Sequence, residues 1–299
     1  MLSNITKSLY DHEEKQYLSI VKDICETGDK IHGRNGYTLS KNGASMYFCL
    51  RDNKLPVLTT KKMAIKTCVK ELLWFISGDT NNNTLVRQNV HIWDGNGSKD
   101  FLESRGLSYE ENDLGPVYGH QWRHFNAPYV DCHTDYTGQG HDQLGYIINS
   151  LKHPDDKYSR RLILSAWNPC QLDEMALPPC HLLVQFNVNS KDELSCSLYQ
   201  RSGDMGLGVP FNILSYCVLT HLLAKHCGLK AGEFIHHIGN AHVYDDHVDN
   251  LLEQTTREPL KFPTIHIDSI KDNINDYSIE DIHIENYTHL SPVKLNMRK

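Results

Sequence analysis

Apolar side chains recur at intervals of three and four residues in two stretches of the N-terminal part of the chain. The first stretch covers residues 13–27 and stops at Gly28, and the second runs from about 64 to 77 and stops at Gly78. This spacing places apolar side chains on one face of a helix, and glycine is common just after a helix end. Both stretches are therefore predicted to be amphipathic helices that pack on a core.

A third helical pattern covers residues 212–227, and Gly228 follows it as a predicted C-terminal cap. Asn212 stands at the start of this pattern, where an asparagine side chain commonly caps the first turn. On local grounds, capping is favoured over a binding role for Asn212. Another helix is predicted to begin near Asp245.

Alternation of apolar and polar residues predicts strands in the middle of the chain. Residues 182–188 and 194–198 alternate in this way, and the polar turn 189–192 between them favours a hairpin. Residues 161–167 indicate a buried strand. The tail after residue 258 mixes prolines with short β-like runs.

Residues 94–145 are rich in Gly, Asn, Asp and aromatic residues, which predicts loops with short elements. Long ordered loops in a compact domain are often functional. Helices and hairpins are interspersed along the chain, without an internal repeat or a linker. We therefore expect an α+β fold in a single domain over residues 1–299.

Composition narrows the class of protein. The chain has 299 residues, a formal net charge of −7 and 9 cysteines. The negative charge argues against a general binder of nucleic acid. The odd cysteine count without a C-x-x-C pair argues against a disulfide framework or a zinc knuckle. Residues 1–15 do not resemble a signal peptide, and no apolar run approaches the ~20 residues of a membrane span. These features favour a cytoplasmic protein with reduced thiols.

The segment Pro178-Pro179-Cys180-His181 carries the first candidate for chemistry. Two prolines hold the backbone extended just before a thiol at the entrance to a predicted strand. A thiol fixed in this way suits nucleophilic attack. The alternative is that Cys180 is a small buried apolar residue, as most single cysteines are.

Arginines provide candidate anion ligands. Arg160 and Arg161 open one predicted strand, and Arg201 follows the predicted hairpin. Arginine binds phosphate with two N–H groups and would favour a nearby thiolate; the alternative for each is a surface salt bridge. Residues 200–212 are rich in glycine but fit neither spacing of the common phosphate-binding loops.

His242 and Tyr244 lie two residues apart, so on an extended segment both side chains would face the same way. They could grip a sugar hydroxyl, or they could be two half-buried strand residues. The histidines at 236, 237, 242 and 247 match no known zinc-ligand spacing, so no metal site is predicted.

Taken together, these segments resemble the thymidylate synthase family. The matching segments follow the family order: 58–62, 71–75, 92–94, 113–119, 160–161, 166–169, 176–181, 200–212 and 241–244. The most specific are Pro-Pro-Cys-His and Gly-Leu-Gly-Val-Pro-Phe-Asn. The resemblance implies conversion of dUMP to dTMP, with 5,10-methylenetetrahydrofolate as the donor of both carbon and hydride. It also implies a large mixed sheet flanked by helices and a homodimer that packs sheet to sheet.

The resemblance assigns catalytic roles to five residues. Cys180 would attack C6 of the uracil, and Asn212 would recognise the base. Glu71 would move protons through ordered water near O4, and Tyr118 would assist removal of the C5 proton. His181 would support the nucleophile.

The resemblance also assigns ligand-binding residues. For dUMP they are Arg34, Arg201, Gln200, Ser202, Asp204, Asn212, His242 and Tyr244, with Arg160 and Arg161 reaching in from the partner subunit. For folate they are Trp93, Asp204, Leu207, Phe211 and Lys61.

Two alternatives remain open at this stage. A dUMP hydroxymethylase on the same fold would use water in place of hydride, and a non-catalytic relative would bind only nucleotide or RNA. The presence of Cys180, Glu71, Tyr118 and Asn212 argues against the second, because binding alone needs no thiol. Regulatory RNA binding by an active enzyme is left open.

Overall fold

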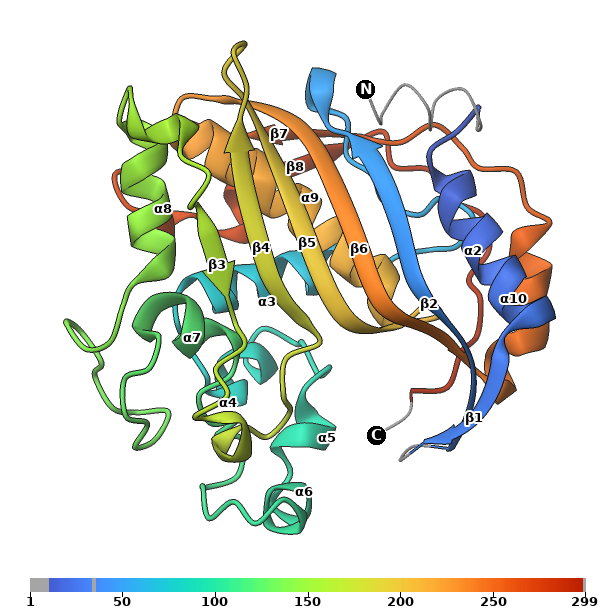
Figure 1. Cartoon of the computed structure of the whole chain (residues 1–299), viewed down its shortest axis with the longest axis horizontal. Helices are drawn as coiled ribbons and strands as arrows, with labels where there is room; N and C mark the ends of the chain where they lie inside the picture. The colour runs from blue at the N-terminus through green and yellow to red at the C-terminus, as the bar shows by residue number, and fades with distance from the viewer. Residues whose placement is uncertain (1–10, 34–35, 298–299) are drawn as a thin grey trace.

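The computed structural model describes residues 11–33 and 36–297, and a six-stranded sheet lies at its centre (Figure 1). The strand order is β1-β2-β6-β5-β4-β3, and every neighbouring pair is antiparallel except the parallel pair β5–β6. The bounds are Asp29–Gly33 for β1, Gly36–Cys49 for β2, Ile163–Ser165 for β3, His181–Val188 for β4, Glu193–Asp204 for β5 and Lys230–Tyr244 for β6. The sheet is therefore mixed, and the fold is α+β.

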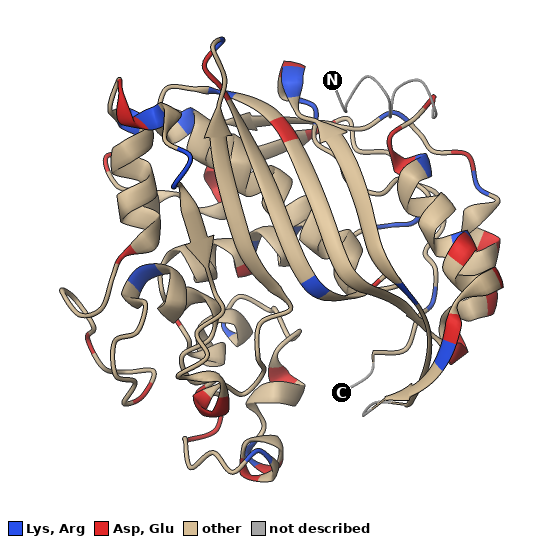
Figure 2. Ribbon diagram, in the orientation of Figure 1, with Lys and Arg blue, Asp and Glu red and all other residues tan. Residues whose placement is uncertain are grey.

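Helices cover one face of this sheet. The longer ones are α2 (Glu14–Thr27), α3 (Ile65–Ile76), α8 (Gln143–Lys152), α9 (Gly208–His226) and α10 (Val248–Thr255). Helix α9 buries most of its 19 residues, because it lies between the sheet and α3. The opposite face, toward the viewer in Figure 1, carries no helix within the described ranges. Charged residues gather on the outer helices and loops, and the strands carry few (Figure 2).

Short elements complete the fold. They are α4 (Asn82–Val86), α5 (Asp94–Gly97), α6 (Lys99–Ser104), α7 (Tyr118–His124) and a small two-stranded sheet of β7 (Thr264–Ile267) and β8 (Ile282–Glu285). The expected loop-rich region thus holds three short helices. The β-like runs of the tail form the small sheet. No helix of residues 11–33 and 36–297 is long and apolar enough to span a membrane.

The predicted helices are confirmed with small shifts at their ends. Helices α2 and α3 match the stretches 13–27 and 64–77 within one residue at each end. Gly228 follows α9 and adopts a φ of 70°, the left-handed conformation typical of a residue after a helix. A 3-10 turn at Asp245–His247 precedes α10, which begins three residues later than predicted.

The capping role favoured for Asn212 is wrong. Helix α9 begins at Gly208, so Asn212 lies inside it. Pro210 is tolerated this early because the first N–H groups of a helix have no partner within the helix. The side chain of Asn212 points instead to β5, where its Oδ1 accepts a hydrogen bond from Gln200 Nε2 at 3.0 Å.

Two strand predictions are also corrected. The strand expected over residues 161–167 is shorter, since only Ile163–Ser165 pair with β4. Strand β5 is longer than expected and continues to Asp204, so Arg201 lies within the strand and not after the hairpin. Parallel pairing with β6 extends it, with Gln200 opposite Ile238 and Asp204 opposite His242.

Candidate active site

A cavity of about 550 Å³ lies among β5, β6, α3, α9 and the turn before β4. Its wall brings together most of the predicted site residues: Glu71, Trp93, Tyr118, Cys180, His181, Gln200, Arg201, Ser202, Asp204, Leu207, Asn212, His242 and Tyr244. These residues come from segments far apart in the chain. The sheet and α9 therefore assemble the site.

Cys180 lies directly before β4, where the chain enters the sheet. Its backbone N–H donates to the hydroxyl of Tyr118 at 2.8 Å, and its carbonyl accepts from the backbone N–H of Arg201 at 2.9 Å. Contacts with β5 and α7 therefore fix the backbone that carries the thiol.

Two hydrogen bonds hold the side chain of Arg201 against Pro178 and Pro179. Its Nε donates to the carbonyl of Pro179 at 2.7 Å, and its Nη2 donates to the carbonyl of Pro178 at 2.9 Å. The same Nη2 lies 3.8 Å from the sulfur of Cys180. A guanidinium at this distance stabilises negative charge on sulfur, so the Pro-Pro segment holds a cation beside the thiol.

Tyr118 begins α7 and stacks on the ring of His181, with ring centroids 4.1 Å apart. The Nδ1 of His181 lies 2.7 Å from the hydroxyl of Tyr216. Burial lowers the pKa of His181 to about 3, so its ring is neutral near pH 7. The neutral ring of His181 thus packs against Tyr118 and helps hold it beside Cys180.

Gly115 shapes the approach of the chain to Tyr118. Its φ is 72°, and a Cβ at this position would lie 2.1 Å from the carbonyl oxygen of Glu174. Only glycine fits this close passage, which brings the start of α7 to the cavity.

Glu71 extends from α3 into the cavity wall, where its Oε1 accepts a hydrogen bond from Trp93 Nε1 at 2.7 Å. Burial raises the pKa of Glu71 to about 7, and the bond from Trp93 partly offsets the effect of burial. The carboxyl group can therefore both hold and release a proton near neutral pH. Such a group suits general acid–base chemistry.

This pKa predicts a pH-dependent contribution to stability. Between about pH 4.5 and pH 7, folded Glu71 keeps a proton that the unfolded chain has lost, so raising the pH lowers the free energy of unfolding. The contribution is complete below pH 4.5, is lost through pH 7, and amounts to on the order of 3 kcal/mol. Urea unfolding of Glu71→Gln and of wild type measures this effect. Between pH 4.5 and pH 8, the free energy of unfolding of the variant should rise by that amount relative to that of wild type.

The exposed residue Glu285 offers a matched control, since Glu285→Gln removes a carboxylate that water already solvates. Its stability profile should run parallel to that of wild type. A parallel profile for Glu71→Gln would contradict the raised pKa.

A series of hydrogen-bonded side chains connects β6 to Asn212. His236 Nε2 lies 2.8 Å from Gln200 Oε1, and Gln200 Nε2 donates to Asn212 Oδ1. Burial lowers the pKa of His236 to about 3, so the ring is neutral, and its Nε2 must carry the hydrogen because an amide oxygen only accepts. His236 therefore sets the orientation of the amide of Gln200, which in turn orients Asn212.

Sequence reasoning missed His236 and Tyr216 as parts of this site. In the sequence, His236 stands out only as one of four histidines whose spacing fits no zinc site. A usable signal was available, because His236 falls on the apolar face of an alternating strand and is fully buried in the structure. A polar group in that position needs a partner.

His242 and Tyr244 end β6 and face the same cavity, as their spacing predicted. Their ring centroids lie 5.6 Å apart, and His242 Nδ1 lies 3.1 Å from the Oδ1 of Asn240. Both side chains are part-buried and line the cavity.

Lys61 does not line the cavity. It is buried under the turn that joins β5 to α9, where its Nζ donates to the carbonyl of Gly206. Burial lowers the pKa of Lys61 to about 8. In the same turn, Asp204 Oδ1 accepts from the N–H groups of Gly206 at 2.8 Å and Leu207 at 3.3 Å. In this structure Lys61 supports the turn that presents Asp204 and Leu207.

Three other predicted residues with described positions also fall outside the cavity wall of this chain. Phe211 packs against the core. Arg160 and Arg161 are exposed on the segment before β3. Arg34 lies outside the described residues. The cavity therefore receives one predicted arginine, Arg201, from the described part of its own chain.

Comparison with known proteins adds the family. The thymidylate synthase family model matches residues 15–299. The chain is 50% identical over 290 residues to thymidylate synthase of Ascaris suum, which covers 96% of this chain and 97% of that protein. It is 52% identical to the bifunctional dihydrofolate reductase-thymidylate synthase of Leishmania amazonensis, over 96% of this chain and 55% of that protein. It is 49% identical to the probable thymidylate synthase of Schizosaccharomyces pombe, over 95% of this chain and 47% of that protein.

The chain thus spans about half the length of the Leishmania amazonensis and Schizosaccharomyces pombe proteins. With the Ascaris suum protein it shares nearly the full length of both chains. The chain belongs to the thymidylate synthase family.

Proposed function

We propose that this protein is a thymidylate synthase that converts dUMP to dTMP and 5,10-methylenetetrahydrofolate to dihydrofolate. One observation carries the proposal: Cys180, Glu71, Tyr118 and Asn212 line a single cavity, with Arg201 against the thiol. A cavity that only bound nucleotide would not need a nucleophile, a cation beside it and a part-buried carboxyl group with a raised pKa.

The reacting carbon, C5 of uracil, is a poor nucleophile. Addition of the Cys180 thiolate to C6 makes C5 nucleophilic and places negative charge on O4. Glu71, with a pKa near neutrality, holds or releases a proton on that side of the ring through water. Tyr118, whose hydroxyl accepts a hydrogen bond from the backbone N–H of Cys180, would help remove the C5 proton.

The wall beside Cys180 fits a reduced folate. Trp93 and Leu207 supply apolar surface for a flat ring, and Asp204 supplies a carboxylate. Bound folate would supply the one-carbon unit and the hydride. Trp93 and Leu207 would exclude water from the reacting carbon, and this exclusion separates a synthase from a hydroxymethylase. Phe211 and Lys61 would act on the folate indirectly, by holding this wall in place.

Phosphate binding is assigned to Arg201 with help from a second chain. A guanidinium has five N–H donors, and Arg201 spends two of them on Pro178 and Pro179, so donors remain for phosphate. Arg160 and Arg161 are exposed and would complete the site of a partner subunit. Arg34 remains a predicted ligand, and Gln200, Ser202, His242 and Tyr244 would hold the base and sugar.

The proposed homodimer packs the helix-free faces of two large sheets together. Two features support this arrangement: that face carries exposed apolar side chains, including Ile163 and Tyr199, and the strands carry few charges (Figure 2). None of the nine cysteines forms a disulfide, which supports the proposed cytoplasmic location.

Mass spectrometry with 5-fluoro-dUMP tests the proposal directly. Fluorine cannot leave C5 as a proton does, so the reaction should stop with nucleotide and folate bound covalently to the peptide that contains Cys180. The adduct should form only when 5,10-methylenetetrahydrofolate is also present. A folded protein that forms no adduct would contradict the proposal. With dUMP itself, 5-hydroxymethyl-dUMP as the main product would favour the hydroxymethylase alternative.

A further inference from the structure

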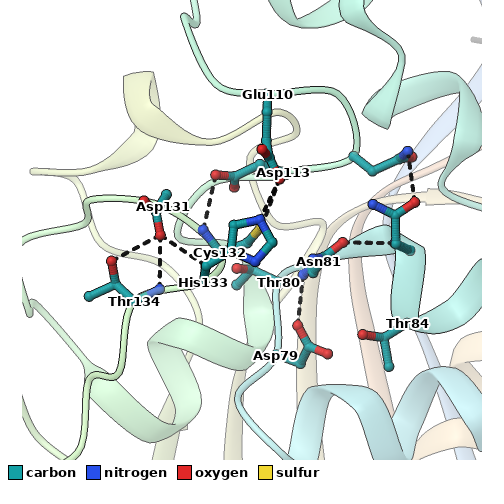
Figure 3. Close-up of polar contacts among 12 residues, drawn as sticks. Asp79, Thr80, Asn81, Thr84, Glu110, Asp113, Asp131, Cys132, His133 and Thr134 are labelled. Carbon is teal, nitrogen blue, oxygen red and sulfur yellow. Dashed lines mark hydrogen bonds and ion pairs between the residues drawn. The ribbon is translucent and has the colours of Figure 1, made fainter.

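Two surface loops bring three metal-type ligands together outside the cavity. Glu110 lies in the loop between α6 and α7, and Cys132 and His133 lie in the loop between α7 and α8. Their ligand atoms all lie within 4.8 Å of one another. Figure 3 shows the carboxylate of Glu110 directed at both partners: it pairs with His133 Nε2 and lies 4.0 Å from the sulfur of Cys132.

A buried carboxylate fixes the two loops relative to each other. Asp113 is fully buried, and it accepts hydrogen bonds from the hydroxyl of Tyr129 at 2.6 Å and from the backbone N–H of Cys132 at 3.0 Å. Asp131 accepts from the backbone N–H of His133 at 2.9 Å. The backbone that carries two of the three ligands is thus held in place before any ion binds, which lowers the cost of binding.

The surroundings of the cluster are strongly negative. Three carboxylates, those of Glu110, Asp113 and Asp131, contact the side chains or the backbone of Cys132 and His133. A divalent cation bound between the two loops would balance this negative charge.

We propose that Glu110, Cys132 and His133 bind one divalent cation of the zinc class. A thiolate, an imidazole and a carboxylate form a ligand set that Zn²⁺ accepts, whereas Mg²⁺ and Ca²⁺ prefer oxygen ligands alone. Ligand atoms around a tetrahedral zinc lie about 3–4 Å apart. The observed spacing therefore needs only side-chain rotations. On binding, the thiol of Cys132 would release its proton to solvent, and water would fill the fourth position.

The bound ion would act as a clamp between the two loops and not as a catalyst. None of its three ligands lines the active-site cavity. The proposal is independent of the proposed function, because it would hold even for a chain with no turnover.

Cobalt titration of the full reduced chain tests the site, because a Cys–Co²⁺ bond gives a thiolate-to-metal charge-transfer band. We expect the band to saturate at one Co²⁺ per chain and to disappear on addition of Zn²⁺. Cys132→Ser should abolish the band, and Glu110→Gln should weaken Co²⁺ binding at least about tenfold. Cys170→Ser, which changes an exposed thiol, and Cys180→Ser, which removes the active-site thiol, should keep it.

Thermal unfolding provides a second measurement. Zn²⁺ should raise the midpoint of the wild type and of Cys170→Ser, but not that of Cys132→Ser. His133→Asn gives an independent variant if Cys132→Ser fails to fold, and it should lose most of the affinity. A wild-type chain without the band, or a Cys132→Ser chain that keeps it, would overturn the proposal. The first result would leave Glu110 and His133 as a surface ion pair only.

Discussion

Replacing Cys180 with serine is expected to lower the turnover of dUMP by at least about 10⁴-fold, the scale seen when a covalent nucleophile is removed. A serine hydroxyl needs a base to become nucleophilic. The neighbouring histidine cannot serve, because burial lowers the pKa of His181 to about 3 and its Nδ1 is engaged by Tyr216. The guanidinium of Arg201 would stabilise a thiolate but cannot accept a proton.

Binding of dUMP to Cys180→Ser should change only a few-fold, because the residues assigned to the phosphate, base and sugar are untouched. Dihydrofolate formation measures turnover, and calorimetry measures the dissociation constant of dUMP. Cys170→Ser is a matched control, since it makes the same change at an exposed position. Turnover by Cys180→Ser within tenfold of wild type would contradict the covalent mechanism.

The helices of this fold were predictable because their signal is local. The apolar repeats of α2 and α3 lie within the helices themselves, and their glycine stops follow directly. The start of α9 was missed because a capping asparagine looks the same whether it begins a helix or lies inside one. The direction of the Asn212 side chain depends on Gln200, 12 residues earlier on a strand that the helix packs against.

The same distinction applies to the site. Two prolines beside Cys180 mark it as a candidate nucleophile, but the contacts of those prolines do not follow from their positions in the sequence. Their carbonyls hold the guanidinium of Arg201, more than 20 residues away in the chain. Parallel pairing of β5 with β6 extends β5 far enough to bring Arg201 there, and parallel pairing leaves no local sequence signal. The contacts of Cys180 therefore depend on the folded sheet and not on the residues next to it in the sequence.

Changing Asn212 to aspartate is expected to relax the selectivity for uracil over cytosine. An asparagine amide can accept from N3–H and donate to O4 of uracil, and cytosine presents the opposite pattern at both positions. An aspartate has no amide to donate to O4, whereas it can accept from the exocyclic amine of cytosine. With two hydrogen bonds affected at about 1–2 kcal/mol each, or roughly 2–4 kcal/mol together, the ratio of kcat/KM for dUMP to that for dCMP should fall by at least about 30-fold.

The hydrogen bonds that orient Asn212 should also hold an aspartate at this position. Gln200 Nε2 donates to Asn212 Oδ1, and the neutral ring of His236 fixes Gln200 in that orientation. An aspartate oxygen accepts the same bond, so the side chain should keep its position and only its hydrogen-bonding pattern should change. Asn149→Asp adds the same charge at an exposed position on α8 and should leave the ratio unchanged. If Asn212→Asp rejects dCMP as strongly as wild type does, the base is recognised elsewhere, and the role assigned to Asn212 is wrong.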